Sequence, residues 1–141
     1  MFNLCYALVL ILVILLFFRH VKSSQAEDIL RRISNEAASD NAEMVRLFEI
    51  LVSERHRKQY QARALNLILH FLRPNQVIRI LQNSGLSRDI RLRVLNHILD
   101  SQEGFSPEDF ATGYRYAKKE NRALATAFLN KARETWPNYP E

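Results

Sequence analysis

The chain contains little cysteine, glycine and proline: its 141 residues include one cysteine, three glycines and four prolines. Because Cys5 is the single cysteine, an intrachain disulfide and a cysteine-based metal site are both excluded. The few glycines and prolines leave few tight turns, and alternating runs of β-branched residues are also scarce. The composition therefore predicts an all-α fold.

Sequence motifs of enzyme chemistry are missing as well. The chain has no glycine-rich phosphate loop, no Gly-x-Ser-x-Gly elbow and no His-Glu-x-x-His pair. The four histidines are His20, His56, His70 and His97. They stand far apart in the sequence, so each is expected to be structural or solvated rather than a metal ligand. We therefore expect no enzymatic activity, no bound metal and no cofactor.

One long hydrophobic segment lies at the N-terminus. Leu4 to Phe18 is an unbroken run of fifteen apolar residues, preceded by one strongly polar residue, Asn3. The first eighteen residues, as a helix, reach roughly 27 Å, which is about the thickness of the hydrocarbon core of a bilayer. Residues 1 to 22 are therefore predicted to form a single transmembrane anchor with a basic flank. Residues 23 to 141 are predicted to form a soluble α-helical domain.

The alternative for this segment is a cleaved secretory signal, because Ser24 and Ala26 place small residues where a signal peptidase cuts. Two features favour an anchor that is retained. No Lys or Arg precedes the apolar run, and Arg19, His20 and Lys22 follow it where a cleavable signal has a neutral stretch.

The charges beside the apolar run also predict an orientation. Arg19 and Lys22 flank its C-terminal end, whereas its N-terminal flank carries only the α-amino group of the chain. The positive-inside rule then places the soluble domain in the cytoplasm. The alternative is the reverse topology, with the helical domain on the periplasmic or extracytoplasmic side.

Helical periodicity and start signals divide the rest of the chain into short helices. Pro74 is expected as the first residue of one helix that ends at Gly85, and Ser87 and Ser106 are expected to cap two others. Residues from about 25 to 38 are predicted to be helical, either as a separate helix or as a continuation of the membrane helix. Because the connections are short, neighbouring helices are expected to pack antiparallel as hairpins.

The hairpin predicted for residues 106 to 137 resembles one tetratricopeptide repeat, a pattern of two helices with small residues where the helices cross. The residues at the spacings of that pattern are Gly113, Tyr116, Ala125, Ala132 and Pro137. The resemblance implies a stack of antiparallel hairpins that binds extended peptides or partner helices in a groove lined by the first helices of the repeats. In such a hairpin, Gly113 and Ala125 let two backbones approach, and Tyr116 fills the space beside them.

Three positions of this hairpin depart from the family pattern. Asp109, Thr112 and Leu129 stand where the family prefers Trp, Leu and an aromatic residue. Phe110 and Phe128, each one residue away, are expected to compensate by filling the same space. The resemblance covers only this hairpin, and no second copy occurs upstream.

Four residues near the C-terminus are candidates for contact with a partner. Arg115 and Lys119 lie on the first helix of the hairpin, and the alternative for both is a solvated charged face. Trp136 and Tyr139 form an aromatic tail after the last helix. Trp136 is expected to cover the hydrophobic core, and the alternative is that it docks on a partner.

Basic residues are concentrated in the middle of the chain. Residues 23 to 54 hold three basic and seven acidic side chains, whereas residues 55 to 93 hold nine basic and one acidic, a formal +8. The nine are Arg55, Arg57, Lys58, Arg63, Arg73, Arg79, Arg88, Arg91 and Arg93. They either pair with the acidic first segment or form one basic patch. A patch would attract anionic lipid headgroups, an acidic protein or, least of all, nucleic acid.

Taken together, these features predict a membrane-anchored adaptor or scaffold that binds other protein subunits. Its expected place is a membrane-associated complex, such as a secretion or envelope assembly. The alternative is a peripheral module that uses the basic stretch of residues 55 to 93 to bind anionic lipid or nucleic acid.

Overall fold

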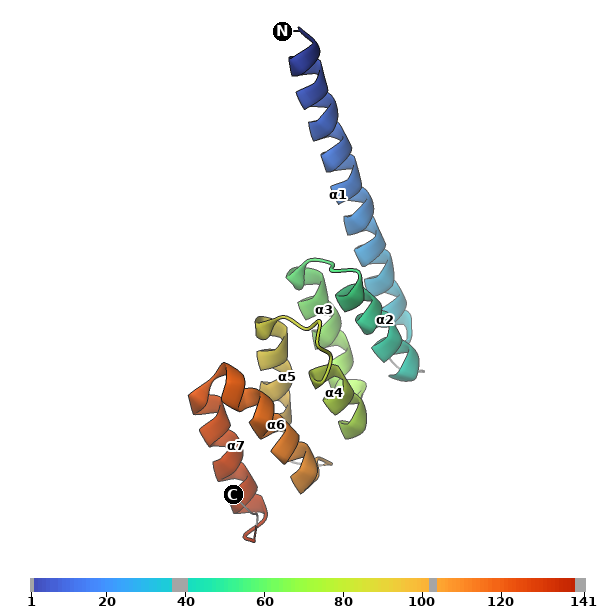
Figure 1. The fold of residues 1–141 in the computed structure, drawn as a ribbon. Helices are drawn as coiled ribbons and strands as arrows, with labels where there is room; N and C mark the ends of the chain where they lie inside the picture. The colour runs from blue at the N-terminus through green and yellow to red at the C-terminus, as the bar shows by residue number, and fades with distance from the viewer. Residues whose placement is uncertain (1, 37–40, 102–103, 139–141) are drawn as a thin grey trace.

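The computed structural model describes residues 2–36, 41–101 and 104–138 of the chain. Within these ranges there are seven α-helices, one 3-10 turn and no strand, so the predicted all-α fold is confirmed (Figure 1). The elements, in chain order, are α1 (Phe2–Glu36), α2 (Asn41–Ser53), α3 (Lys58–Ile68), the 3-10 turn η1 (Leu69–Phe71), α4 (Pro74–Leu81), α5 (Arg88–Asp100), α6 (Pro107–Glu120) and α7 (Arg122–Thr135).

Helix α1 has two halves with opposite surroundings. The side chains from Leu4 to Phe18 are exposed, and this half extends away from the other helices (Figure 1). By length and composition, α1 is long and apolar enough to cross a membrane. In its second half, one face packs on α2 and α3 through residues at helical spacing. These buried residues are Ala26, Ile29, Leu30 and Ile33.

The two halves of α1 form one uninterrupted helix. Of the two alternatives for residues 25 to 38, continuation of the N-terminal helix is therefore correct as far as Glu36. The remainder of that predicted helix, residues 37 and 38, lies outside the described residues.

The other helices form a stack in which most helices that are neighbours in sequence pack together. Helix α2 packs on α1, and α3 packs on both of them. Helix α4 contacts α5 and α6, α5 contacts α6, and α6 packs along α7 (Figure 1). Their buried side chains join into one hydrophobic core. The finer expectation, a tetratricopeptide-like stack of antiparallel helix hairpins, stays a prediction.

Several predicted helix starts are confirmed. Pro74 is the first residue of α4. Ser87 caps α5, because its hydroxyl accepts a hydrogen bond from the backbone N–H of Ile90. Ser106 and Asp109 exchange backbone-to-side-chain hydrogen bonds of 2.9 and 3.1 Å at the start of α6, which is a capping box. Helix α4 ends at Leu81, four residues before the predicted end at Gly85.

The α6–α7 hairpin is held by aromatic contacts. The rings of Phe110 and Phe128 lie edge to face with their centres 5.7 Å apart, so these two residues fill the core of the hairpin as expected. Trp136 packs edge to face on Phe110 with a ring-centre distance of 5.1 Å. Trp136 is half-buried against the core, as the covering role predicted for it requires.

The space above Gly113 is filled by an aromatic ring from the opposite helix. A Cβ atom at position 113 would lie 2.5 Å from Cε1 of Phe128. A residue without a side chain is therefore needed at position 113 for the Phe128 ring to lie there. The predicted approach of two backbones at Gly113 and Ala125, with Tyr116 beside them, stays a prediction.

We expect Gly113→Ala to lower the free energy of unfolding by about 1–3 kcal/mol, because overpacking against Phe128 outweighs the gain in helix propensity. Urea denaturation of the full chain in detergent micelles measures the change. Adding Phe128→Leu to this variant should restore part of the lost stability. If Gly113→Ala is as stable as the wild type, the ring does not occupy this space.

Candidate functional site

Most of the basic stretch is engaged in ion pairs. Five of its nine side chains lie within 4.0 Å of a carboxylate in the described part of the chain. The pairs are Arg63–Glu27 at 2.9 Å, Arg79–Glu49 at 2.9 Å, Lys58–Asp89 at 3.5 Å, Arg88–Glu120 at 3.3 Å and Arg91–Glu120 at 3.1 Å. Two of these basic residues thus pair with the acidic first segment, and three pair with carboxylates further along the chain.

The Arg91–Glu120 pair is the most enclosed of these contacts, with side chains 15% and 19% exposed. Nη2 of Arg91 also donates to the carbonyl oxygens of Asn83 and Leu86, each at 3.4 Å. Its guanidinium carbon lies 5.6 Å from the centre of the Tyr116 ring. Arg91 therefore fastens the first turn of α5 to the last turn of α6 and is not available as part of a surface patch.

Two other basic residues, Arg55 and Arg57, lie in the connection between α2 and α3, which returns to α1. Together with Arg19 and Lys22 of α1, they line a concavity of about 170 Å³. We call these four residues the four-cation cluster. The remaining lining residues are Ser23, His56 and Tyr60.

The turn after α2 fixes the position of the loop that carries Arg55 and Arg57. The backbone N–H of Arg55 donates to the carbonyl of Val52, and that of His56 donates to the carbonyl of Leu51, which closes the helix in a Schellman-type turn. Arg55 takes the left-handed conformation, φ 54°, that glycine usually supplies at this position. His56 is thereby turned inward and buried, and its carbonyl accepts a hydrogen bond of 2.9 Å from Nε2 of Gln61.

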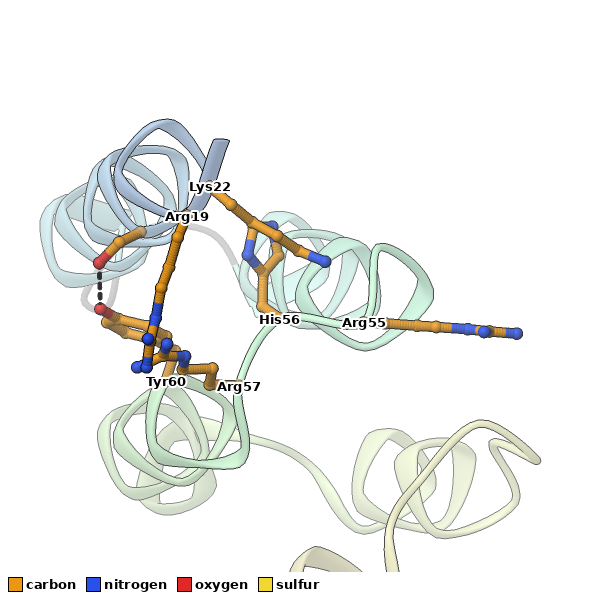
Figure 2. Close-up of a pocket in the computed structure, with 7 residues that line it drawn as sticks. Arg19, Lys22, Arg55, His56, Arg57 and Tyr60 are labelled. Atoms are coloured by element: carbon orange, nitrogen blue, oxygen red, sulfur yellow. Dashed lines mark hydrogen bonds between the residues drawn. The ribbon is translucent and has the colours of Figure 1, made fainter. Parts of the chain in front are cut away.

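A side-chain hydrogen bond between the hydroxyls of Ser23 and Tyr60 joins α1 to α3 at the floor of the concavity (Figure 2). Arg19 extends down from α1 and Arg57 extends across from the connection after α2, so that both lie beside Tyr60, and Lys22 extends over His56 (Figure 2). Arg55 belongs to the lining, but its side chain extends away from the others (Figure 2).

None of the described residues that line this concavity carries a carboxylate. Among the described residues, no Asp or Glu oxygen lies within ion-pair distance of any member of the four-cation cluster. The nearby Glu54 is 3.0 Å from Nε2 of His56 and forms its contact there. Guanidinium groups offer several donors in a fixed plane, so the arrangement is suited to an anion with more than one oxygen.

The partner-binding candidates near the C-terminus are not brought together into one site. Arg115 and Lys119 are exposed on α6, and Nζ of Lys119 lies 5.9 Å from the ring centre of Tyr116. Trp136 is packed against the core, and Tyr139 lies outside the described residues. Arg73 and Arg93, the last two members of the predicted basic patch, are exposed on other parts of the stack.

One pair of histidines that lie far apart in the sequence is close in space. The rings of His70 and His97 lie edge to face with their centres 6.2 Å apart, beside Pro74 and Phe105 in a concavity of about 190 Å³. Burial, together with the positive charge of a protonated His70, lowers the pKa of His97 below its usual value. Among the described residues, no group of three His, Cys, Asp or Glu side chains is placed to hold a metal ion.

Comparison with protein-family models, with curated proteins and with solved structures finds no match to this chain. The resemblance of residues 106 to 137 to a tetratricopeptide repeat therefore stays a prediction. Function is inferred from the arrangement of the residues themselves.

Replacing Glu120 by Gln is expected to lower the free energy of unfolding by about 1–3 kcal/mol, because Arg91 loses the charge that faces it in a poorly solvated position. Chemical denaturation of the full chain in micelles gives the value. The matched control is Asp89→Asn, which removes a pair with Lys58 whose side chains are 66% and 71% exposed. That change should cost less than about 0.5 kcal/mol, and equal losses in the two variants would contradict a structural role for Arg91.

The lowered pKa of His97 predicts that stability falls as the pH falls. The unfolded chain binds a proton at His97 more readily than the folded chain does, so acidification through about pH 6.5 favours unfolding. Melting temperatures measured between about pH 8 and 5 should decline more steeply for the wild type than for His97→Gln. His20→Gln, at an exposed position of α1, is the control and should keep the slope of the wild type. Identical slopes for wild type and His97→Gln would contradict this assignment.

Proposed function

We propose that this chain is a membrane-anchored adaptor whose helical stack binds other protein subunits of a membrane-associated complex, such as a secretion or envelope assembly. The observation that carries the proposal is the double role of α1. Its exposed apolar half suits a bilayer, and its second half contributes fully buried residues, among them Ala26 and Ile33, to the core of the stack. A helix shared in this way mounts the stack rigidly on the anchor.

The same helix supports retention of the N-terminal segment. Signal cleavage next to Ala26 would cut α1 at a residue that is 0% exposed and packed in the core. The chain would then lose part of the face on which α2 and α3 rest. The proposal therefore includes an anchor that stays attached, and the cytoplasmic side is the orientation that Arg19 and Lys22 favour.

The surface of the stack also supports protein binding. Outside α1, the large hydrophobic side chains that are exposed among the described residues are Leu67 and Phe71, at 39% and 48%. Leu67 lies near the end of α3 and Phe71 at the end of η1, and each exposes apolar surface to a partner. Exposed apolar side chains of this kind are frequent centres of protein interfaces.

The test is to extract the tagged chain from its native membranes in mild detergent and to determine the mass and composition of the particle. We expect other proteins to co-purify and the particle to exceed the 16.5 kDa of the full-length chain. Leu67→Ser with Phe71→Ser should release these proteins, because the apolar contact is lost. Gln59→Ser with Asn66→Ser, at two exposed polar positions of α3, is the control and should retain them.

Recovery of a lone monomer would count against the adaptor. In the same preparation, the intact mass of the chain shows whether residues 1 to 26 are retained. Protease protection in intact cells or organelles identifies the side of the membrane on which the stack lies.

A further inference from the structure

The four-cation cluster lies directly beside the end of the apolar half of α1. Arg19 is the first residue after Phe18, and the lining residues of α1 end at Ser23. Four residues of helix cover roughly 6 Å, which is about the depth of the headgroup region on one side of a bilayer. With the apolar half of α1 in the hydrocarbon, the concavity therefore opens at the level of the lipid phosphates.

The charge of the cluster is not balanced by the protein. Five other basic residues of the 55 to 93 stretch have carboxylate partners, whereas Arg19, Lys22, Arg55 and Arg57 have none among the described residues. Arg19 and Arg57 come from elements far apart in sequence and still point to the same place beside Tyr60 (Figure 2). Bringing like charges together is unfavourable unless an anion occupies the space between them.

The floor of the concavity is fixed by contacts that do not involve the cations. The Ser23–Tyr60 hydrogen bond joins α1 to α3, and His56 is buried with its carbonyl bound to Gln61. The side chains of Arg19 and Arg57 are exposed and are free to close on a ligand. The site thus combines a base held by these contacts with exposed donors beside it, which suits the oxygens of a phosphate group.

We propose that three members of the four-cation cluster, Arg19, Lys22 and Arg57, bind the phosphate of an anionic phospholipid in the leaflet next to the helical stack. Arg19 and Arg57 donate to the phosphate oxygens, and Lys22 adds a positive charge beside them. The acyl chains of the same lipid lie along the exposed apolar half of α1, which ends in Phe17 and Phe18 at 63% and 64% exposure. This inference rests on the retained anchor of the proposed function, and it does not depend on any protein partner.

A lipid fits these observations better than the other anions. Nucleic acid would require a basic surface that continues along the stack, but the nearest basic residues on α3, Lys58 and Arg63, are paired with carboxylates. One lipid molecule can contact both features at once, because its phosphate binds the cations of the concavity while its acyl chains lie on the apolar half of α1.

The experiment uses the full chain in detergent micelles, titrated with phosphatidylglycerol or phosphatidylcholine and observed by native mass spectrometry. We expect the first phosphatidylglycerol to bind more tightly than phosphatidylcholine. Arg19→Gln with Arg57→Gln should weaken its binding by about tenfold or more, because two charge-assisted contacts are lost. Both positions are exposed, and a thermal melt of the variant checks that the stack remains folded.

Two control variants separate a defined site from general attraction. Arg73→Gln with Arg93→Gln removes the same charge from exposed positions outside the cluster and should leave the affinity close to that of the wild type. Arg55→Gly removes a cation whose side chain points away from the concavity (Figure 2). Because φ is 54° at Arg55, this change should raise the melting temperature and reduce lipid affinity less than the Arg19 and Arg57 changes do.

Several results would overturn the proposal. Equal affinity for the two lipids, or equal losses in the cluster variant and in the Arg73 and Arg93 variant, would show that no defined lipid site exists. Inorganic phosphate that binds in lipid-free micelles as tightly as phosphatidylglycerol would assign the site to a soluble anion, and a preference for a short oligonucleotide would assign it to nucleic acid.

The outcome is independent of the test of the adaptor. Lipid binding is measured on the purified chain alone, whereas the adaptor is tested by the proteins that leave the native membrane with it. Both proposals assume that the N-terminal anchor is retained. An intact mass that lacks residues 1 to 26 would contradict this assumption, and the mass is measured before either test is interpreted.

Discussion

The fold depends on one helix that has to satisfy two environments. The first half of α1 is exposed and apolar along its whole circumference, whereas the second half is amphipathic and supplies a buried face to α2 and α3. The change occurs within one turn, at Arg19 to Lys22, without a break in the helix. Helices α2 and α3 pack on the buried face of α1, and helices α4 to α7 continue the stack beyond them.

Charge is used in two different ways along this stack. Away from α1, several arginines form ion pairs between helices: Arg79 pairs with Glu49, and Arg91 with Glu120 connects α5 to α6 in a partly buried contact. At the start of the stack, Arg19 and Arg57 converge without a carboxylate among the described residues. The net positive charge of the middle stretch is therefore a poor guide to function, because position and pairing decide which cations remain available.

Features encoded by adjacent residues could be predicted, and features that depend on folding could not. The caps at Ser87 and Ser106 follow from residues within one turn, so these helix starts are correct. The meeting of Arg19 with Arg57 depends on the left-handed turn at Arg55, where no glycine marks the position. The meeting of these two arginines also depends on the packing of α3 against α1. The contact of His70 with His97 likewise exists only because α5 packs against the end of α3.

If α1 spans a bilayer as proposed, its unbroken course couples the geometry of the stack to the thickness of that bilayer. Residues 2 to 18 of the helix reach roughly 26 Å, slightly less than a typical hydrocarbon core, so a thicker bilayer would have to thin locally around the helix. A thinner one is matched by tilt. Since no hinge separates the two halves of α1, any tilt of such an anchor would swing the α4–α7 end of the molecule sideways over the lipid surface. Hydrophobic mismatch would then set the angle at which the protein meets its surroundings.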